Sequence, residues 1–181
     1  MLQYSFEQLH DQPGVLKAVD EDVTVTAEFK ERSRNLINDA KNIHVQGQFF
    51  ADGDYVTGNF HVTAEVEAPS TRSLAPVDLE QDFDFTETYC DHKPTAEELE
   101  DNPDLIQIAD GEIDLQTAVE DNLLLSLPTT ILTPAEKNDD LFPHGQGWEV
   151  VSEQKAAQAR TDKPNPAFAK LKGLFPPDKD N

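Results

Sequence analysis

Residues 42–68 read NIHVQGQFFADGDYVTGNFHVTAEVEA, and the segment holds two runs in which apolar and polar side chains alternate. The runs meet at Asp52-Gly53, a pair that readily adopts the left-handed backbone conformations of a tight turn. After the turn, apolar residues recur with the period of a half-buried β-strand. They are Val56, Phe60, Val62, Ala64 and Val66. We therefore predict an antiparallel β-hairpin over this segment.

Further strands are predicted on both sides of the hairpin. Before it, apolar residues alternate with polar ones at Leu2, Tyr4 and Phe6, and again at Val23, Val25 and Ala27. After it, residues 77–89 read VDLEQDFDFTETY, with the aliphatic and aromatic residues at odd positions. The even positions include Asp78, Glu80, Asp82 and Asp84. This strand is expected to bury one face and to present a densely anionic face to solvent.

A helix is predicted between Asp114 and Leu127, within the segment GEIDLQTAVEDNLLLSLP. Asp114 can cap it, an apolar stripe recurs at helical spacing, and Pro128 ends it. The stripe consists of Leu115, Ala118, Val119, Leu123 and Leu127. The residues expected to face outward are Glu112, Gln116, Glu120, Asp121 and Asn122. A shorter helix is predicted after Thr95, where Thr-Ala-Glu-Glu has the form of a capping box.

The predicted fold is α+β, with a mostly antiparallel sheet or partly closed barrel from the N-terminal half, packed by the amphipathic helix. We expect a single domain over residues 1–151, in which 133–151 is mostly loop. Residues 152–181 are rich in proline and lysine. They are predicted to form a mobile, mildly basic C-terminal arm with helices over 152–160 and 166–174.

The chain is strongly acidic, because 36 Asp and Glu against 14 Lys and Arg give a formal net charge of −22. Most of this charge lies in residues 78–140, which contain 19 acids and two lysines. Such a surface repels phosphate groups, so binding to DNA or to an anionic membrane is not expected. The N-terminus lacks the pattern of a signal peptide, and no apolar run approaches the ~20 residues that span a bilayer. We therefore expect a cytoplasmic protein.

No arrangement of residues indicates catalysis. The five histidines are scattered, and the sequence contains no Gly-rich phosphate loop, GxSxG elbow or HExxH motif. Cys90 is the single cysteine, which excludes an intramolecular disulfide and a multi-cysteine zinc site within one chain. Cys90 and His92 could ligate one metal ion, but two ligands are too few to indicate a site. We expect a non-enzymatic protein with no cofactor and no metal.

The order of these motifs resembles the YceD family of bacterial large-subunit ribosomal RNA accumulation proteins. The resemblance rests on VTAEVEA at 62–68, the strand at 77–89, the acidic helix that ends in Leu-Pro, and KPNPAFAKLKGLF at 163–175. It implies a non-enzymatic cytoplasmic factor in ribosome biogenesis that supports the synthesis, processing or stability of large-subunit (23S) rRNA.

The chain departs from the family pattern at one loop. Many members carry Cys-x-x-Cys after the hairpin, whereas residues 70–77 read STRSLAPV here, with Ser70 and Ser73 at the two positions. A second match, Phe142-Pro143-His144-Gly145, also lacks both thiols. Serine hydroxyls do not replace thiolates on zinc. We expect a metal-independent fold, with the loop held by packing of Leu74 and Val77 or by hydrogen bonds from Ser70, Thr71 and Ser73.

Two routes connect this charge pattern to ribosomal RNA. In the favoured route, an acidic face binds a basic ribosomal protein or assembly factor. Its candidate residues are Asp78, Glu80, Asp82, Asp84, Glu112, Glu120 and Asp121. In the second route, the C-terminal arm contacts rRNA or the ribosome through Lys163, Lys170 and Lys172.

Two further interpretations stay open. A ligand-binding barrel would use Phe49, Phe60, Phe83 and Phe85 to line an apolar cavity. A nuclease acting on rRNA would use clustered acids to bind Mg²⁺. Aromatic side chains on strand faces are more often ordinary core residues, and adjacent acids are expected by chance in so acidic a chain.

Overall fold

The structure is a computed structural model that describes residues 2–108, 110–137, 142, 144–151 and 156–157. The chain divides into two compact units, Met1–Ile131 and Leu132–Asn181. The predicted arm over 152–181 and its two helices lie almost wholly outside the described residues. The division of the chain after residue 151 therefore stays a prediction.

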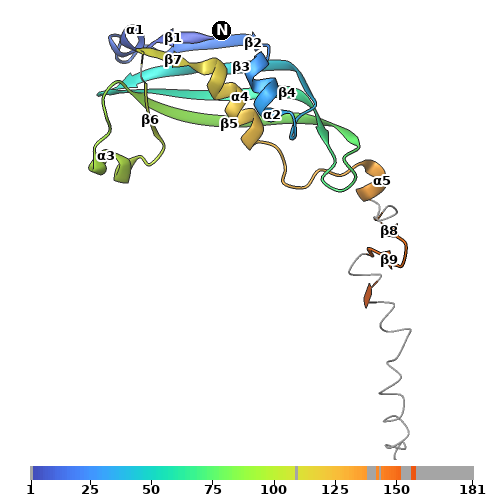
Figure 1. Ribbon diagram of the computed structural model, residues 1–181. Coiled ribbons are helices and arrows are strands. Elements are labelled where there is room, and N and C mark those ends of the chain that lie inside the picture. Colours follow the sequence, from blue (N-terminus) through green and yellow to red (C-terminus); the bar gives the residue numbers. More distant parts are fainter. Residues whose placement is uncertain (1, 109, 138–141, 143, 152–155, 158–181) are drawn as a thin grey trace, which may run out of the picture. The chain divides into compact units, whose positions relative to one another are not determined.

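The first unit is built on a five-stranded sheet in the order β2-β3-β4-β5-β6 (Figure 1). The strands are β2 (Lys17–Val23), β3 (Asp39–Asp52), β4 (Tyr55–Pro69), β5 (Pro76–Cys90) and β6 (Leu105–Gln107). Neighbouring strands are antiparallel except β5 and β6, which are parallel. β3 and β4 form the predicted hairpin, and Gly53 in its turn has a φ of 59°. The predicted α+β class and antiparallel sheet are confirmed.

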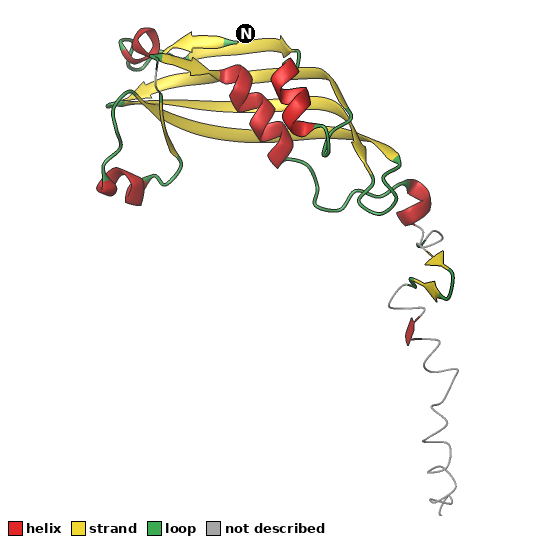
Figure 2. Cartoon of the chain, in the orientation of Figure 1, coloured by secondary structure: helices red, strands yellow, loops and turns green. Residues whose placement is uncertain are grey.

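Two helices cover one face of this sheet. Figure 2 shows α2 (Ala27–Ser33) and α4 (Leu115–Leu125) side by side across it. α4 begins where the sequence predicts, because Asp114 accepts a hydrogen bond from the Thr117 backbone N–H (3.0 Å). The alternative of a partly closed barrel is wrong, because β2 and β6 end the sheet without pairing to each other. No helix among the described residues is long and apolar enough to span a membrane.

The two strands predicted nearest the N-terminus differ from the structure. β1 (Gln3–Ser5) pairs with β7 (Glu112–Asp114) in a separate small sheet, but Phe6 begins helix α1 (Phe6–His10). Of the second predicted strand, only Val23 lies in a strand, as the last residue of β2, and Ala27 already begins α2. Thr26 caps α2 by accepting a hydrogen bond from the Phe29 backbone N–H (3.1 Å). Local capping thus overrides a short alternating pattern at both places.

The inner face of the sheet is filled by aromatic rings. Phe60 contacts Phe49 and Phe85, with ring centroids 4.9 and 5.2 Å apart. Gly47 and Gly58 make room for these rings, because a Cβ at either position would collide with Phe60. Phe49, Phe60 and Phe85, which were candidates for the lining of a ligand cavity, therefore pack on one another as core residues.

The β4–β5 connection holds its shape through serine hydroxyls. Ser70 Oγ accepts hydrogen bonds from the backbone N–H groups of Arg72 (3.1 Å) and Ser73 (3.3 Å). Thr71 donates from its backbone N–H and its hydroxyl to the Ile131 carbonyl (2.8 and 3.0 Å). The expected hydrogen bonds at Ser70 and Thr71 are present, and Ser73 Oγ accepts one from the Ala75 N–H (3.4 Å). Val77 packs against the core as expected, but Leu74 does not, since it is 76% exposed.

Short elements complete the described chain. In the first unit, the predicted capping box at Thr95 is confirmed at the start of α3 (Ala96–Asp101). In the second unit, α5 (Pro134–Lys137) precedes a two-stranded hairpin of β8 (His144–Gly145) and β9 (Trp148–Glu149). Residues 133–151 are predicted as mostly loop, but Thr133 and Glu136 form a Thr-x-x-Glu pair that starts α5.

Candidate functional site

The face of the five-stranded sheet that points away from α2 and α4 is the candidate site, which we call the acidic sheet face. Strand alternation assigns side chains to it, because buried and exposed residues take turns along β3, β4 and β5. Its acids are Asp20 and Asp22 from β2, Asp39 and Asp52 from β3, Glu65 and Glu67 from β4, and Asp78, Glu80, Asp82 and Asp84 from β5. Among the described residues of this face, Lys41 is the one permanent cation.

The β5 acids lie as the sequence predicts. Asp78, Glu80, Asp82 and Asp84 are all exposed, and the alternate residues Leu79 and Phe83 pack at the margin of the core. The Asp84 side chain is 84% exposed. The acids of β2, β3 and β4 were missed, although the alternation in the hairpin segment already assigns Glu65 and Glu67 to the face opposite Val66.

Acidic side chains face one another across the strands at one end of the sheet. Glu65 lies directly opposite Glu80, and Glu67 lies directly opposite Asp78. Like charges at directly opposed positions destabilise an antiparallel pair. Lys41, at 3.8 Å from Glu65, offsets this repulsion only in part. Asn42 Nδ2 donates to Glu65 (2.9 Å) and Asn38 Nδ2 donates to Glu67 (3.1 Å), but neither amide carries a charge. The folded chain therefore tolerates an unfavourable arrangement here.

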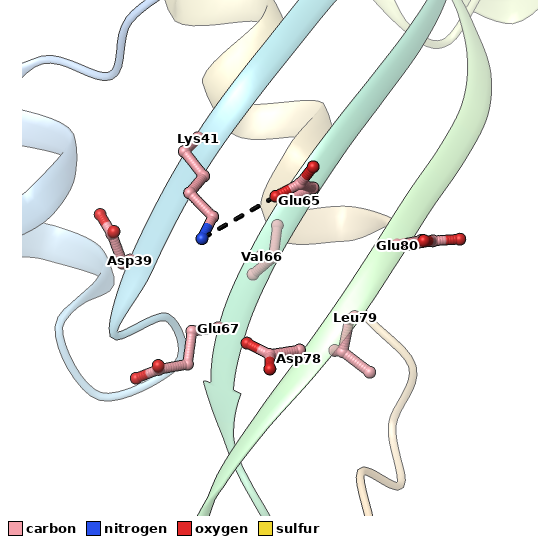
Figure 3. A pocket seen from close by; sticks show the side chains of 8 residues that line it. All are labelled: Asp39, Lys41, Glu65, Val66, Glu67, Asp78, Leu79 and Glu80. Atoms are coloured by element: carbon pink, nitrogen blue, oxygen red, sulfur yellow. Dashed lines mark ion pairs between the residues drawn. The ribbon is translucent and has the colours of Figure 1, made fainter.

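A groove lies over these opposed pairs (Figure 3). Its volume is about 520 Å³, and five of its lining side chains are carboxylates. Its lining residues are Asp39, Lys41, Glu65, Val66, Glu67, Asp78, Leu79 and Glu80. A hollow with this charge attracts a cationic side chain and repels a phosphate.

Two histidines of the acidic sheet face lie in matching settings. His44 lies 3.2 Å from Asp20 and 2.8 Å from Asp22, both on β2. On the other side of the hairpin, His61 lies 2.9 Å from Asp84 and 3.6 Å from Asp82 on β5. Each imidazole therefore bridges two carboxylates of a neighbouring strand.

Glu120, by contrast, does not belong to any exposed face, and its predicted placement on the acidic surface is wrong. Its side chain is 4% exposed. Glu120 Oε1 accepts hydrogen bonds from the Thr26 backbone N–H (2.7 Å) and from Gln116 Nε2 (2.9 Å). Thr26 Oγ1 donates to the second carboxylate oxygen (3.0 Å). Glu120 thus joins α4 to the start of α2, and Gln116, also predicted to face outward, is buried with it.

The other helix-side acids are separated from the β5 acids by the sheet itself. Asp121 pairs with Arg32 of α2, and Glu112 is exposed in β7. α4 contacts the inner face of β5, because Asn122 Nδ2 donates to Glu87 (2.8 Å) and Ser126 Oγ donates to Gln81 (3.1 Å). The expectation that strand acids and helix acids form one surface is therefore wrong.

A second polar cluster surrounds Glu98 at the start of α3. Tyr55 donates to Glu98 Oε1 (2.6 Å), and His92 Nε2 lies 2.8 Å from the same oxygen. The hydrogen bond from Tyr55, with others from Thr95 and His92, lowers the pKa of Glu98 well below its ordinary value. The bond to Glu98 also raises the pKa of Tyr55 to about 12. This cluster fixes α3 to the β4 hairpin end.

The Cys90 thiol contacts the His92 backbone. It is buried, and its Sγ lies 3.3 Å from the backbone carbonyl of His92. Burial raises the pKa of the thiol, which disfavours the thiolate that a metal would need. In the described residues, no group of three or more His, Cys, Asp or Glu side chains is placed to hold a metal ion. Lys163, Lys170 and Lys172 lie outside the described residues.

Comparison with known proteins identifies one family. Residues 58–175 match the family described as large ribosomal RNA subunit accumulation protein YceD. The match begins within β4 and includes all of β5 and α4. No curated protein and no solved structure matches the chain. Because the match extends over more than half of the sequence, the chain belongs to the YceD family.

Proposed function

We propose that this chain supports the accumulation of large-subunit rRNA as a non-enzymatic, cytoplasmic factor that binds a basic ribosomal protein or assembly factor. The acidic sheet face is the binding surface. The observation that carries the proposal is the pair of opposed acids, Glu65 with Glu80 and Glu67 with Asp78, beneath one groove. The family name supports the connection to ribosomal RNA.

A cationic protein suits this face better than any other ligand class. Lysine and arginine side chains placed between opposed carboxylates would convert repulsion into attraction, so binding would relieve a cost of folding. Rows of like charge also increase the rate of encounter with a partner of opposite charge. RNA phosphates would meet repulsion from the same side chains.

Salt-dependent affinity purification tests the proposal. The tagged chain is incubated with ribosomal proteins at low and at moderate salt, and both protein and RNA are recovered. We expect basic proteins to be retained at low salt and released at moderate salt, because screening weakens exposed charge pairs. The outer-row variant carries Asp78→Asn, Glu80→Gln, Asp82→Asn and Asp84→Asn, and it should lose this retention.

A matched control removes the same number of charges elsewhere. Glu97, Glu100, Asp101 and Asp104 are exposed in and after α3, and none of them lines the groove. Their conversion to Gln and Asn should leave retention intact. Equal retention by the outer-row variant would contradict the proposal. Crosslinks that recover only RNA, through Lys163, Lys170 or Lys172, would instead favour the C-terminal arm as the contact.

A further inference from the structure

β5 runs along one margin of the sheet (Figure 1). Its outer neighbour β6 pairs only with Thr88–Cys90. In the part of the chain that the structure describes, residues 76–87 therefore border no other strand on this side. An unpaired strand edge of this length presents a row of backbone groups that another strand can pair with.

The backbone groups that point outward can be assigned from β6. The Cys90 carbonyl accepts a hydrogen bond from the Ile108 N–H (2.9 Å), so the backbone of Cys90 faces away from β4. This direction alternates along a strand, and the β4–β5 register has no irregularity. The outward residues are consequently Asp78, Glu80, Asp82, Asp84 and Thr86. Among the described residues, their outward backbone groups have one partner, a long 3.4 Å bond from Gln81 Nε2 to the Glu80 carbonyl.

The same residues thus supply both the free backbone groups and the acidic side chains. A strand added to this edge would place its directly opposed side chains on the acidic sheet face, within cross-strand contact distance of Asp78 to Asp84. Its alternate side chains would lie on the inner side, beside the partly buried Leu79 and Phe83. The edge therefore favours an alternation of basic and apolar residues in the added strand.

The other edge of the sheet is less suited to strand addition. β2 is half as long, and Lys17 and Glu21 place charges on its inner side as well, where both are exposed. A second copy of β5 is also a poor occupant, because its acids would lie opposite the acids of the first. Charged edges of this kind prevent self-pairing.

We infer that the outer edge of β5 binds an extended segment of the basic partner by strand addition, with Lys or Arg at alternate positions facing Asp78 to Asp84 and apolar residues between them. This inference rests on the proposed function and specifies how the acidic sheet face is used. Backbone pairing supplies affinity in such complexes, and the alternating side chains supply specificity.

Amide hydrogen exchange followed by NMR tests the inference, with a short peptide of alternating lysine and valine as the probe. In the free protein, the amides of Glu80, Asp82 and Asp84 should exchange faster than those of Leu79 and Phe83. Adding the peptide should slow the exchange of the Glu80, Asp82 and Asp84 amides. A peptide of the same composition, with its lysines and valines in two blocks, should protect them less.

A pair of variants separates backbone pairing from charge. Glu80→Gln and Glu80→Pro both remove one carboxylate, but only proline removes the outward N–H, and an edge strand tolerates proline at such a position. We expect Glu80→Pro to bind the alternating peptide about five- to tenfold more weakly than Glu80→Gln, the effect of one lost hydrogen bond. Unchanged slow exchange at Leu79 and Phe83 would verify that the variant is folded. A peptide N-methylated at alternate positions gives the same test without altering the protein.

The outcomes distinguish the inference from the proposed function. Binding of the peptide without protection of the fast amides, or with equal affinity for both Glu80 variants, would overturn strand addition and leave the acidic sheet face as a binding surface. Failure of the wild-type chain to bind either the peptide or any basic ribosomal protein would overturn both.

Discussion

The two faces of the main sheet differ although the same strands form both. On the inner face, β4 alternates Val56, Phe60, Val62 and Val66 against α2 and α4, and all four are buried. On the outer face, the intervening positions of β4 and β5 include directly opposed carboxylates. Burial of apolar surface stabilises the inner face, whereas the outer face adds electrostatic repulsion. Stability and the proposed binding are thus assigned to opposite sides of one sheet.

The carboxylates on the two sides show the same contrast at single residues. Glu120, on the helix side, accepts hydrogen bonds from Thr26 and Gln116 and lies 3.8 Å from Arg32. Within the described chain, the side chains of Asp78 and Glu80 have neither a hydrogen bond nor an ion pair. A buried carboxylate needs such partners, and an exposed one does not. The formal charge of −22 therefore includes structural acids as well as acids available to a partner.

The largest expected effect comes from the inner face. Phe60→Ala should lower the free energy of unfolding by about 3–5 kcal/mol, because it removes a ring that contacts two others and leaves a cavity. Thr63→Ala on the outer face of the same strand should change it by no more than about 0.5 kcal/mol. Urea denaturation followed by circular dichroism measures both. Similar losses in the two variants would contradict the assignment of stability to the inner face.

A smaller loss is expected at the buried carboxylate. Glu120→Ala should destabilise the fold by about 1–3 kcal/mol, because Thr26 and Gln116 lose the acceptor for their donated hydrogen bonds. Asp121→Asn is the matched control, since Asp121 is its neighbour on α4 but half-exposed. It should cost less than about 1 kcal/mol, the usual upper value for an exposed ion pair. If the two variants are equally stable, Glu120 does not join the helices as described.

The sequence predicts the acidic row of β5 because a period of two leaves no freedom in the direction of side chains. Once residues 77–89 form a strand with Leu79 and Phe83 inward, Asp78 and Asp82 must point outward. The opposed pairs could not be predicted in the same way. They depend on the register that places Glu65 against Glu80, and register is a property of two strands together.

The error at Glu120 has a different physical origin. A helical stripe identifies the apolar side, but Glu120 and Gln116 lie on the flank of that stripe, where α2 packs. The backbone N–H of Thr26, at the start of α2, has no partner within its own helix and donates to Glu120, 94 positions away in sequence. No local pattern reveals such a partner, because it is created only by tertiary packing. The same contact ends the second predicted strand and starts α2.

Neutralising the outer row should affect stability and binding in opposite directions. The outer-row variant should be as stable as the wild type or more stable by up to about 1 kcal/mol, since repulsion between opposed acids is relieved. Its retention of basic proteins should be lost. Thermal denaturation at low and high salt is the measurement, and added salt should stabilise the wild type more than the variant. A clear loss of stability would show that these acids serve the fold.

The smallest expected effect concerns Glu98, an acid that is neither buried under a helix nor left without a partner. Hydrogen bonds, first from Tyr55, hold the pKa of Glu98 well below the ordinary 4.5. The stabilisation of α3 by the ionised carboxylate is therefore complete above pH 4.5 and is lost as pH falls through the lowered pKa. The bond to Glu98 raises the pKa of His92 above 6.5. The stabilisation of α3 by protonated His92 is therefore complete below pH 6.5 and is lost as pH rises through the raised pKa. Amide protection of α3, corrected for intrinsic exchange rates, should therefore be greatest between pH 4.5 and 6.5. Glu98→Gln should flatten this profile while leaving α4 unchanged, and a flat profile in the wild type would rule out the proposed coupling of Glu98 and His92.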